Sequence, residues 1–133
     1  MERVLVISSE LISINKVRVF LKDVYNDFSL NMISFNHVFL GLSEAVNNAI
    51  LHGNKLNPEK KVIIKTILLG NQMHIDVEDD GDGFCDTILF DPTLPENIKC
   101  ENGRGIFIIH HLADEVSFKE NGRKLHIIFT IPE

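Results

Sequence analysis

Two polar residues in a helical pattern have the types and the spacing to hold a metal ion. Glu44 and Asn48 are four residues apart, so on a helix they lie one turn apart on the same face. A carboxylate and an amide stacked in this way can hold a metal ion with a water or hydroxyl between them. The same spacing is also typical of an ordinary solvated helix face, so the helix alone does not decide.

The helix that carries this pair is indicated by the apolar residues on its other face. They recur every three or four residues, as expected for a face buried against a core. They are Phe35, Val38, Phe39, Leu42, Ala45, Val46, Ala49 and Ile50. The helix is predicted to begin at Asn31 or Ser34 and to stop near Gly53 and Asn54, which are typical of a helix C-terminus.

A second stretch, acidic and glycine-rich, follows directly after a predicted strand. Asp79 precedes Gly81 and Gly83, so an acceptor carboxylate is followed by backbone without Cβ atoms. A flat ring can lie close to such backbone while the carboxylate accepts hydrogens from its amino group. Asp-Gly pairs also form turns, so a simple acidic turn is the alternative. A calcium loop counted from Asp76 is rejected, because its twelfth residue would be Thr87 instead of glutamate.

A third stretch places small residues at the start of a helix. Gly103 and Gly105 allow the backbone to approach a phosphate, and the free amides and dipole of a helix start favour its negative charge. Arg104 can add a charged contact. On its own this stretch is a weak signal, because any helix start can contain glycine.

These three stretches are positioned by a simple order of elements. The pattern predicts strand, helix, helix, hairpin, irregular segment, helix and hairpin, which indicates an α+β fold, a two-layer sandwich. Its sheet is expected to be mixed and mainly antiparallel, with the helices on one face. The predicted strands are 3–8, 61–69, 73–78, 115–119 and 124–131, with turns at Gly70-Asn71 and Asn121-Gly122. The first helix is expected to be capped by Ser8 or Ser9 and to run to about Phe28, and the third to cover about 106–113.

Length and charge limit what kind of protein this is. A chain of 133 residues is expected to form a single domain, residues 1–133, with its own core. The net charge of −6 without a basic cluster argues against direct nucleic-acid binding and against an anionic membrane surface. No apolar run reaches transmembrane length, and the two cysteines do not form a disulfide framework. We therefore expect a cytoplasmic protein.

Together the three stretches predict one site for a nucleoside triphosphate with Mg²⁺. In chain order, Glu44-Ala45-Val46-Asn47-Asn48-Ala49-x-x-His52-Gly53, Asp79-x-Gly81-x-Gly83 and Gly103-x-Gly105 resemble the three sequence boxes of the GHKL ATP-binding fold, shared by gyrase and histidine kinases. The compact size, the leading strand and the stretch 113–116 look most like the anti-sigma-factor serine/threonine kinases of bacteria. The resemblance covers nearly the whole chain.

The resemblance implies a role for each matching residue. Glu44 would be the general base that takes a proton from a substrate serine or threonine, and Asn48 would bind Mg²⁺. Asp79 would accept a hydrogen bond from the adenine amino group, while Asn47 and His52 would lie beside the site. Segment 85–102 would be a lid over the nucleotide. The remaining nucleotide-binding residues would be Gly81, Gly83, Gly103, Arg104, Gly105 and Ile106.

The implied function is that of an ATP-binding anti-sigma factor and kinase. It would phosphorylate a STAS-type anti-sigma-factor antagonist and would be able to sequester a sigma factor, and a homodimer is compatible with the family. The alternative is a regulatory module of a partner-switching circuit that binds nucleotide without turnover. The catalytic part of a sensor histidine kinase is disfavoured, because the chain has no room for a dimerisation helix pair that carries a phosphoacceptor histidine.

Overall fold

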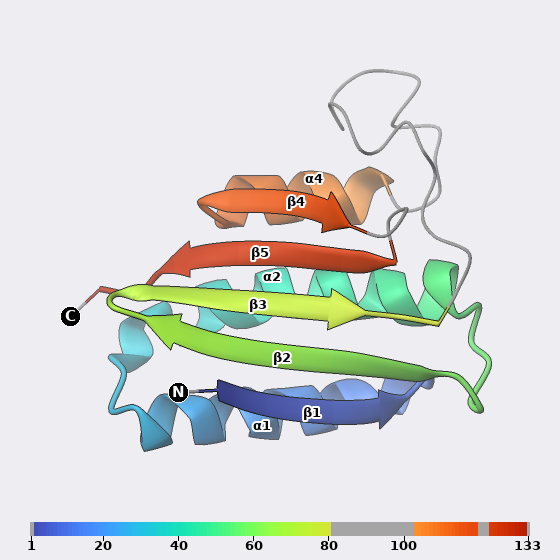
Figure 1. The fold of residues 1–133 in the computed structure, drawn as a ribbon, viewed down its shortest axis with the longest axis horizontal. Coiled ribbons are helices and arrows are strands. Elements are labelled where there is room, and N and C mark those ends of the chain that lie inside the picture. Colours follow the sequence, from blue (N-terminus) through green and yellow to red (C-terminus); the bar gives the residue numbers. More distant parts are fainter. Residues whose placement is uncertain (1, 81–102, 120–122, 133) are drawn as a thin grey trace.

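The computed structural model describes residues 2–80, 103–119 and 123–132 and contains one five-stranded sheet. The strands lie in the order β1-β2-β3-β5-β4 (Figure 1). They are β1 (Glu2–Ser8), β2 (Lys61–Leu69), β3 (Gln72–Glu78), β4 (Glu115–Lys119) and β5 (Lys124–Thr130). Every neighbouring pair in the described sheet is antiparallel, so the sheet is not mixed as the sequence had suggested.

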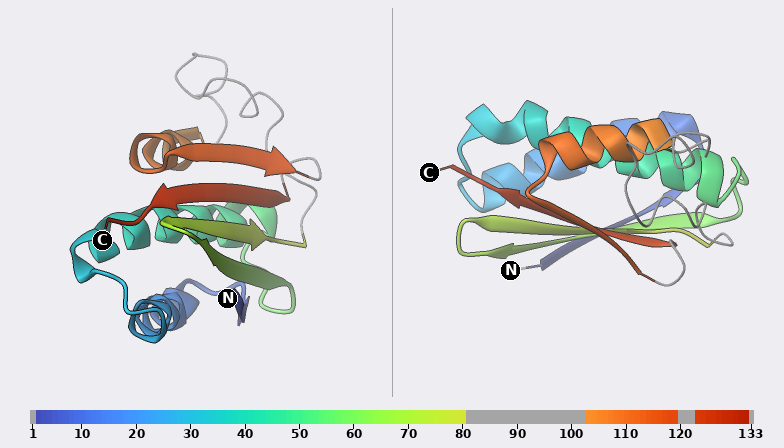
Figure 2. Two further views of the ribbon diagram at one scale, coloured as in Figure 1. Left: turned by 60° about the vertical axis from the view of Figure 1, so that its left-hand side comes forward. Right: turned by 90° about the horizontal axis from the view of Figure 1, so that it is seen from above.

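Within the described residues three α-helices cover one face of this sheet, which confirms the two-layer α+β prediction (Figure 2). They are α1 (Ile14–Asp27), α2 (Phe35–Asn48) and α4 (Gly103–Leu112). Single 3₁₀ turns at Leu11–Ser13 and Met32–Ser34 lead into the first two helices. Helix α2 contacts both α1 and α4 and is therefore the middle helix of the layer. None of the helices in the described part of the chain is long and apolar enough to span a membrane.

The core lies between the helix layer and the sheet. Because side chains alternate along a strand, every second residue of β3 and β5 is buried beneath the helices. The predicted apolar face of α2 is buried as well, except Phe39, which is partly exposed. Gly41 lets α2 approach the sheet closely, because a Cβ atom there would lie 2.7 Å from the ring of Phe129. The alternating buried residues of β3 and β5 are Met73, Ile75, Val77, Leu125, Ile127 and Phe129, and Ile128 is buried as well, on the other face of the sheet.

The turn between β2 and β3 falls where the sequence predicts it. Gly70 has a φ of +62°, a backbone conformation that glycine adopts without strain. The two strands then pair from Leu69 opposite Gln72 down to Ile63 opposite Glu78. This register carries the end of β3, and with it Asp79, to the opposite end of the sheet from the turn.

The predicted cap of the first helix is wrong. Ser13 occupies the N-terminal cap of α1 and makes no side-chain capping hydrogen bond, and the preceding 3₁₀ turn has none either. Ser9 is buried, and its hydroxyl donates instead to the carbonyl oxygen of Lys60 at 2.8 Å. This serine joins the end of β1 to the start of β2.

Candidate functional site

The segments that carry the predicted site residues meet at one end of the sheet. The C-terminal turns of α2, the end of β3 and the start of α4 all lie at the right-hand end in Figure 1. Helix α2 contacts both α4 and β3, so this arrangement does not depend on one viewing direction. Residues far apart in the sequence are thereby brought to a common edge of the molecule.

The closest approach joins Gly53, just past α2, to Asp79, just past β3. A Cβ atom on Gly53 would lie 2.8 Å from Oδ1 of Asp79 and closer still to Cγ and Oδ2. Gly53 is buried and Asp79 is 2% exposed, so the main chain of one residue forms a wall for the carboxylate of the other. Glycine is needed at position 53 because a side chain has no room there, and not because of its backbone conformation. The left-handed residues of this turn are Lys55 and Leu56, with φ values of 53° and 60°.

A wider helical turn leads from α2 to this contact. Residues Ala49–Gly53 form a π-helical turn, which the sequence pattern did not indicate. The main-chain N–H of Asn54 donates to the carbonyl oxygen of Ala49 at 2.8 Å, five residues back. Such turns occur often at functional sites, because the extra residue changes where the following side chains lie.

Glu44 and Asn48 occupy the second half of α2 as predicted, one turn apart. Glu44 is half-buried, and its carboxylate makes no hydrogen bond or ion pair within the described ranges. Asn48 is 5% exposed, and its Nδ2 atom is buried without a hydrogen-bond partner among the residues described. A buried amide N–H left unpaired destabilises a fold by about 1–3 kcal/mol, so Asn48 is poorly explained by stability alone.

The remaining predicted residues are placed only in part. Gly81, Gly83 and the expected lid, 85–102, lie outside the described residues. Residues 103–106 form the first turn of α4, so the predicted helix start begins three residues earlier than Ile106. As in any α-helix, the first main-chain N–H groups of α4 have no partner within the helix, and its N-terminus is the positive end of the helix dipole.

Asn54 is a site residue that sequence reasoning missed. Its Nδ2 donates to Oγ of Ser9 at 2.7 Å and to the carbonyl oxygen of Lys61 at 2.9 Å. Its Oδ1 accepts from the main-chain N–H of Asp80 at 2.8 Å. In the sequence, Gly53-Asn54 looks like an ordinary helix stop. Nothing in a local pattern signals contacts with segments 45 and 26 residues away.

These features fit a magnesium–nucleotide ligand. Asn48 and Glu44 place an amide oxygen and a half-buried carboxylate one turn apart on α2, and such oxygens are ligands that Mg²⁺ accepts. The buried Nδ2 of Asn48, without a partner among the described residues, is a donor that suits a phosphate oxygen. The Asp79 carboxylate packs against the main chain of Gly53. The main-chain N–H of Asp79 donates to the carbonyl oxygen of Arg123 at 3.0 Å. A carboxylate confined in this way presents acceptor oxygens in a fixed direction.

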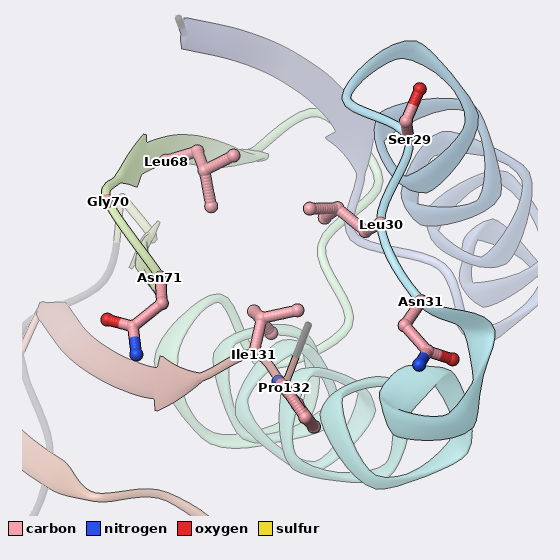
Figure 3. A pocket seen from close by; sticks show the side chains of 8 residues that line it. All are labelled: Ser29, Leu30, Asn31, Leu68, Gly70, Asn71, Ile131 and Pro132. Atoms are coloured by element: carbon pink, nitrogen blue, oxygen red, sulfur yellow. The ribbon is translucent and has the colours of Figure 1, made fainter.

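Two cavities lined by described residues lie elsewhere. One, of about 380 Å³, lies at the other end of the sheet, where the side chains of Leu30, Leu68, Ile131 and Pro132 converge (Figure 3). The other lies along α1 and β1, around Phe20. Neither contains a predicted site residue, so the candidate site rests on the meeting of α2, β3 and α4.

The amino-acid sequence matches a known protein family and resembles named bacterial proteins. A family model described as a histidine kinase-like ATPase domain matches residues 7–131. The chain is 36% identical over 81 residues to the anti-sigma F factor of Anoxybacillus flavithermus, covering 57% of this chain and 53% of that protein. It is 32% identical over 123 residues to the serine-protein kinase RsbW of Staphylococcus aureus, covering 86% and 76%. The chain therefore spans about half the length of the first relative and about three quarters of the second.

The fold has a counterpart among solved structures. A crystal structure of the RsbU and RsbW domains of a Mycobacterium tuberculosis protein matches with a TM-score of 0.66. The match covers 98% of this chain and 31% of that chain at 13% sequence identity. At this identity the likeness concerns the fold.

Proposed function

Because the chain belongs to the histidine kinase-like ATPase domain family, we propose that it is an ATP-binding anti-sigma factor with serine/threonine kinase activity. Its substrate would be a STAS-type anti-sigma-factor antagonist, and its second partner a sigma factor. The observation that carries the proposal is the packing of Asp79 against Gly53, which joins the end of β3 to the helix of Glu44 and Asn48. The names of the two relatives, an anti-sigma factor and a serine-protein kinase, support the same assignment.

The nucleotide would be held by residues from all three segments. The Asp79 carboxylate would accept a hydrogen bond from the adenine amino group, with Gly81 and Gly83 along the ring. The N-terminal turn of α4, residues 103–106, would bind the phosphates through its free amides. The Oδ1 atom of Asn48 would bind Mg²⁺, whose charge neutralises phosphate oxygens during transfer.

The chemical step would be carried mainly by positioning, with Glu44 as the proton acceptor. The hydroxyl oxygen of the partner's serine or threonine forms a bond to the γ-phosphorus, and the bond from that phosphorus to the bridging oxygen breaks. The electron pair leaves with ADP, and the hydroxyl proton passes to the Glu44 carboxylate. A half-buried carboxylate without a partner among the described residues is available for this role.

Phosphoryl transfer to the partner tests the proposal. The protein is incubated with labelled ATP, Mg²⁺ and a STAS-type antagonist, and phosphate on a serine or threonine of the partner is measured. We expect Glu44→Gln to lower the transfer rate by about 100-fold or more, the usual contribution of a general base, while ADP still binds. Glu59→Gln, at an exposed position in the connection between α2 and β2, is the matched control and is expected to be unchanged.

Two outcomes would separate the proposal from its alternative. Transfer at the wild-type rate by Glu44→Gln would remove this residue from the role of base. Intact ADP binding without any transfer by the wild-type protein would instead indicate a regulatory module that binds its partners in a nucleotide-dependent manner. Under either function, the protein would bind its partner proteins in the cytoplasm.

A homodimer is a further part of the proposal, and the uncovered face of the sheet supports it. Four apolar side chains are exposed on the alternate positions that point away from the helices, Val4, Val6, Ile63 and Leu69. Their exposed fractions lie between 38% and 56%. Light scattering of the wild-type protein and of Val6→Lys would test it; a dimeric wild type and a monomeric variant are expected.

A further inference from the structure

Asn54 ties three separate segments together beside the candidate site. It is 1% exposed and follows the π-helical turn at the end of α2. Its side chain reaches Ser9 after β1, Lys61 at the start of β2, and Asp80 after β3, at donor–acceptor distances of 2.7, 2.9 and 2.8 Å. Each of these distances is that of a good hydrogen bond.

The amide group matches this position in full. Its NH₂ has two donor hydrogens, used by Ser9 and Lys61, and its oxygen accepts from Asp80. A carboxylate in its place would turn an acceptor toward the carbonyl oxygen of Lys61, and an apolar side chain would leave buried partners unsatisfied. The position therefore requires both the donors and the acceptor of asparagine.

The segment that Asn54 holds is the one that carries Asp79. The N–H of Asp79 donates to the carbonyl oxygen of Arg123, just before β5, and the Asp80 carboxylate accepts from the N–H of Lys61 on β2 at 3.1 Å. Asn54 adds a tie from the side of α2. The hydrogen bond between Asn54 and Asp80 thus joins the main chain next to Asp79 to the end of α2.

We propose that Asn54 is a positioning residue for adenine recognition, acting through the Asp79–Asp80 main chain. This inference rests on the proposed function, because it assigns the base-recognition role to Asp79. The amide of Asn54 already uses both donor hydrogens and its acceptor oxygen on Ser9, Lys61 and Asp80, so its effect on a nucleotide is indirect. It aligns the base-reading carboxylate with Glu44 and Asn48, which lie on the helix that Asn54 follows.

The test measures selectivity for the adenine amino group. Dissociation constants for ADP and inosine diphosphate, which lacks that amino group, are determined by calorimetry with Mg²⁺ for the wild type and for Asn54→Ala. Since a hydrogen bond to a charged group changes affinity by about 10-fold or more, the wild type is expected to prefer ADP by at least that factor. In Asn54→Ala the preference for ADP is expected to fall below about threefold, and the same fall is expected in Asp79→Asn.

A stability effect is separated from positioning by controls. Asn57→Ala, in the same connection, is expected to keep the wild-type preference, because within the described ranges the exposed side chain of Asn57 bonds only to the N–H of Glu59. Ser9→Ala removes one of the two acceptors of Asn54. It therefore supplies a milder variant if Asn54→Ala does not fold, with an expected fall in preference of about twofold to threefold. Urea midpoints are recorded for every variant.

The outcomes are distinguishable. The inference would be overturned if folded Asn54→Ala kept the wild-type preference for ADP, or, if only Ser9→Ala folds, if Ser9→Ala kept it. This holds even if the urea midpoints fall, because Asn54 would then only stabilise the fold. If the wild type does not bind ADP, or Asp79→Asn leaves the preference unchanged, the proposed function fails, and the inference with it. Loss of preference in Asp79→Asn and Asn54→Ala, but not in Asn57→Ala, supports both.

Discussion

Asn48 is expected to trade stability for function, and replacing it with leucine measures both. The residue lies in the last turn of α2 at 5% exposure, and its Nδ2 is unpaired among the described residues. Leucine branches at the same carbon and carries no polar atom. Asn48→Leu therefore removes the desolvation cost of the amide, about 1–3 kcal/mol, and is a slightly better helix former.

The magnitude can be converted to a melting temperature. For a domain of this size 1 kcal/mol corresponds to about 3–5 °C, so the ligand-free variant is expected to melt about 3–15 °C above the wild type. At the same time the variant loses the amide oxygen proposed to bind Mg²⁺. Its affinity for the magnesium nucleotide is expected to fall at least about 10-fold.

Thermal unfolding with and without ligand is the assay. A ligand that binds only the folded state at 100 times its dissociation constant stabilises that state by about 2.7 kcal/mol. The wild type is expected to show such a rise with Mg²⁺ and a non-hydrolysable ATP analogue, and Asn48→Leu much less of one. Asn47→Leu, at the half-buried neighbouring position, controls for the general effect of leucine in this turn and is expected to change ligand-free stability by a few tenths of a kcal/mol.

A clear result would refute this reasoning. If Asn48→Leu lowers the ligand-free stability by more than about 1 kcal/mol while Asn47→Leu does not, the Asn48 amide stabilises the fold and its burial needs no functional explanation. If the variant is more stable but binds the magnesium nucleotide as tightly as the wild type, the metal role is wrong.

Two further predictions concern Gly53 and Tyr25. Gly53→Ala is expected to lower the free energy of unfolding by about 1–3 kcal/mol, because its Cβ would overlap the buried Asp79 carboxylate; an unchanged urea midpoint would mean that the carboxylate has room to move. Burial raises the pKa of Tyr25, partly offset by its 2.8 Å hydrogen bond to Ser34. Its contribution is therefore complete below the unfolded pKa of about 10 and is lost as the pH rises through the higher folded value. Wild-type stability should fall toward that of Tyr25→Phe above about pH 10, and parallel curves would contradict this.

Much of the architecture follows from local pattern in the sequence. The spacing of Val38, Leu42 and Ala45 indicates the buried face of α2, and Gly70 marks the turn between β2 and β3. These signals are readable because helix and strand periods repeat along the chain itself. The same holds for the three segments of the candidate site, whose residue types suggest the ligand before any contact is known. Whether the chain stands as one domain, and what the segment 85–102 does, stay predictions.

The tertiary structure alone decided how the site is held together. Ser9 is expected from sequence to cap a helix, but it accepts a hydrogen bond from Asn54 across 45 residues. Gly53 and Asn54 look like an ordinary helix stop, but one makes room for Asp79 and the other holds Asp80. Such contacts leave no periodic trace, because they depend on which segments the antiparallel sheet brings side by side. The sequence therefore determines the candidate ligand-binding groups, and their alignment is a property of the folded molecule.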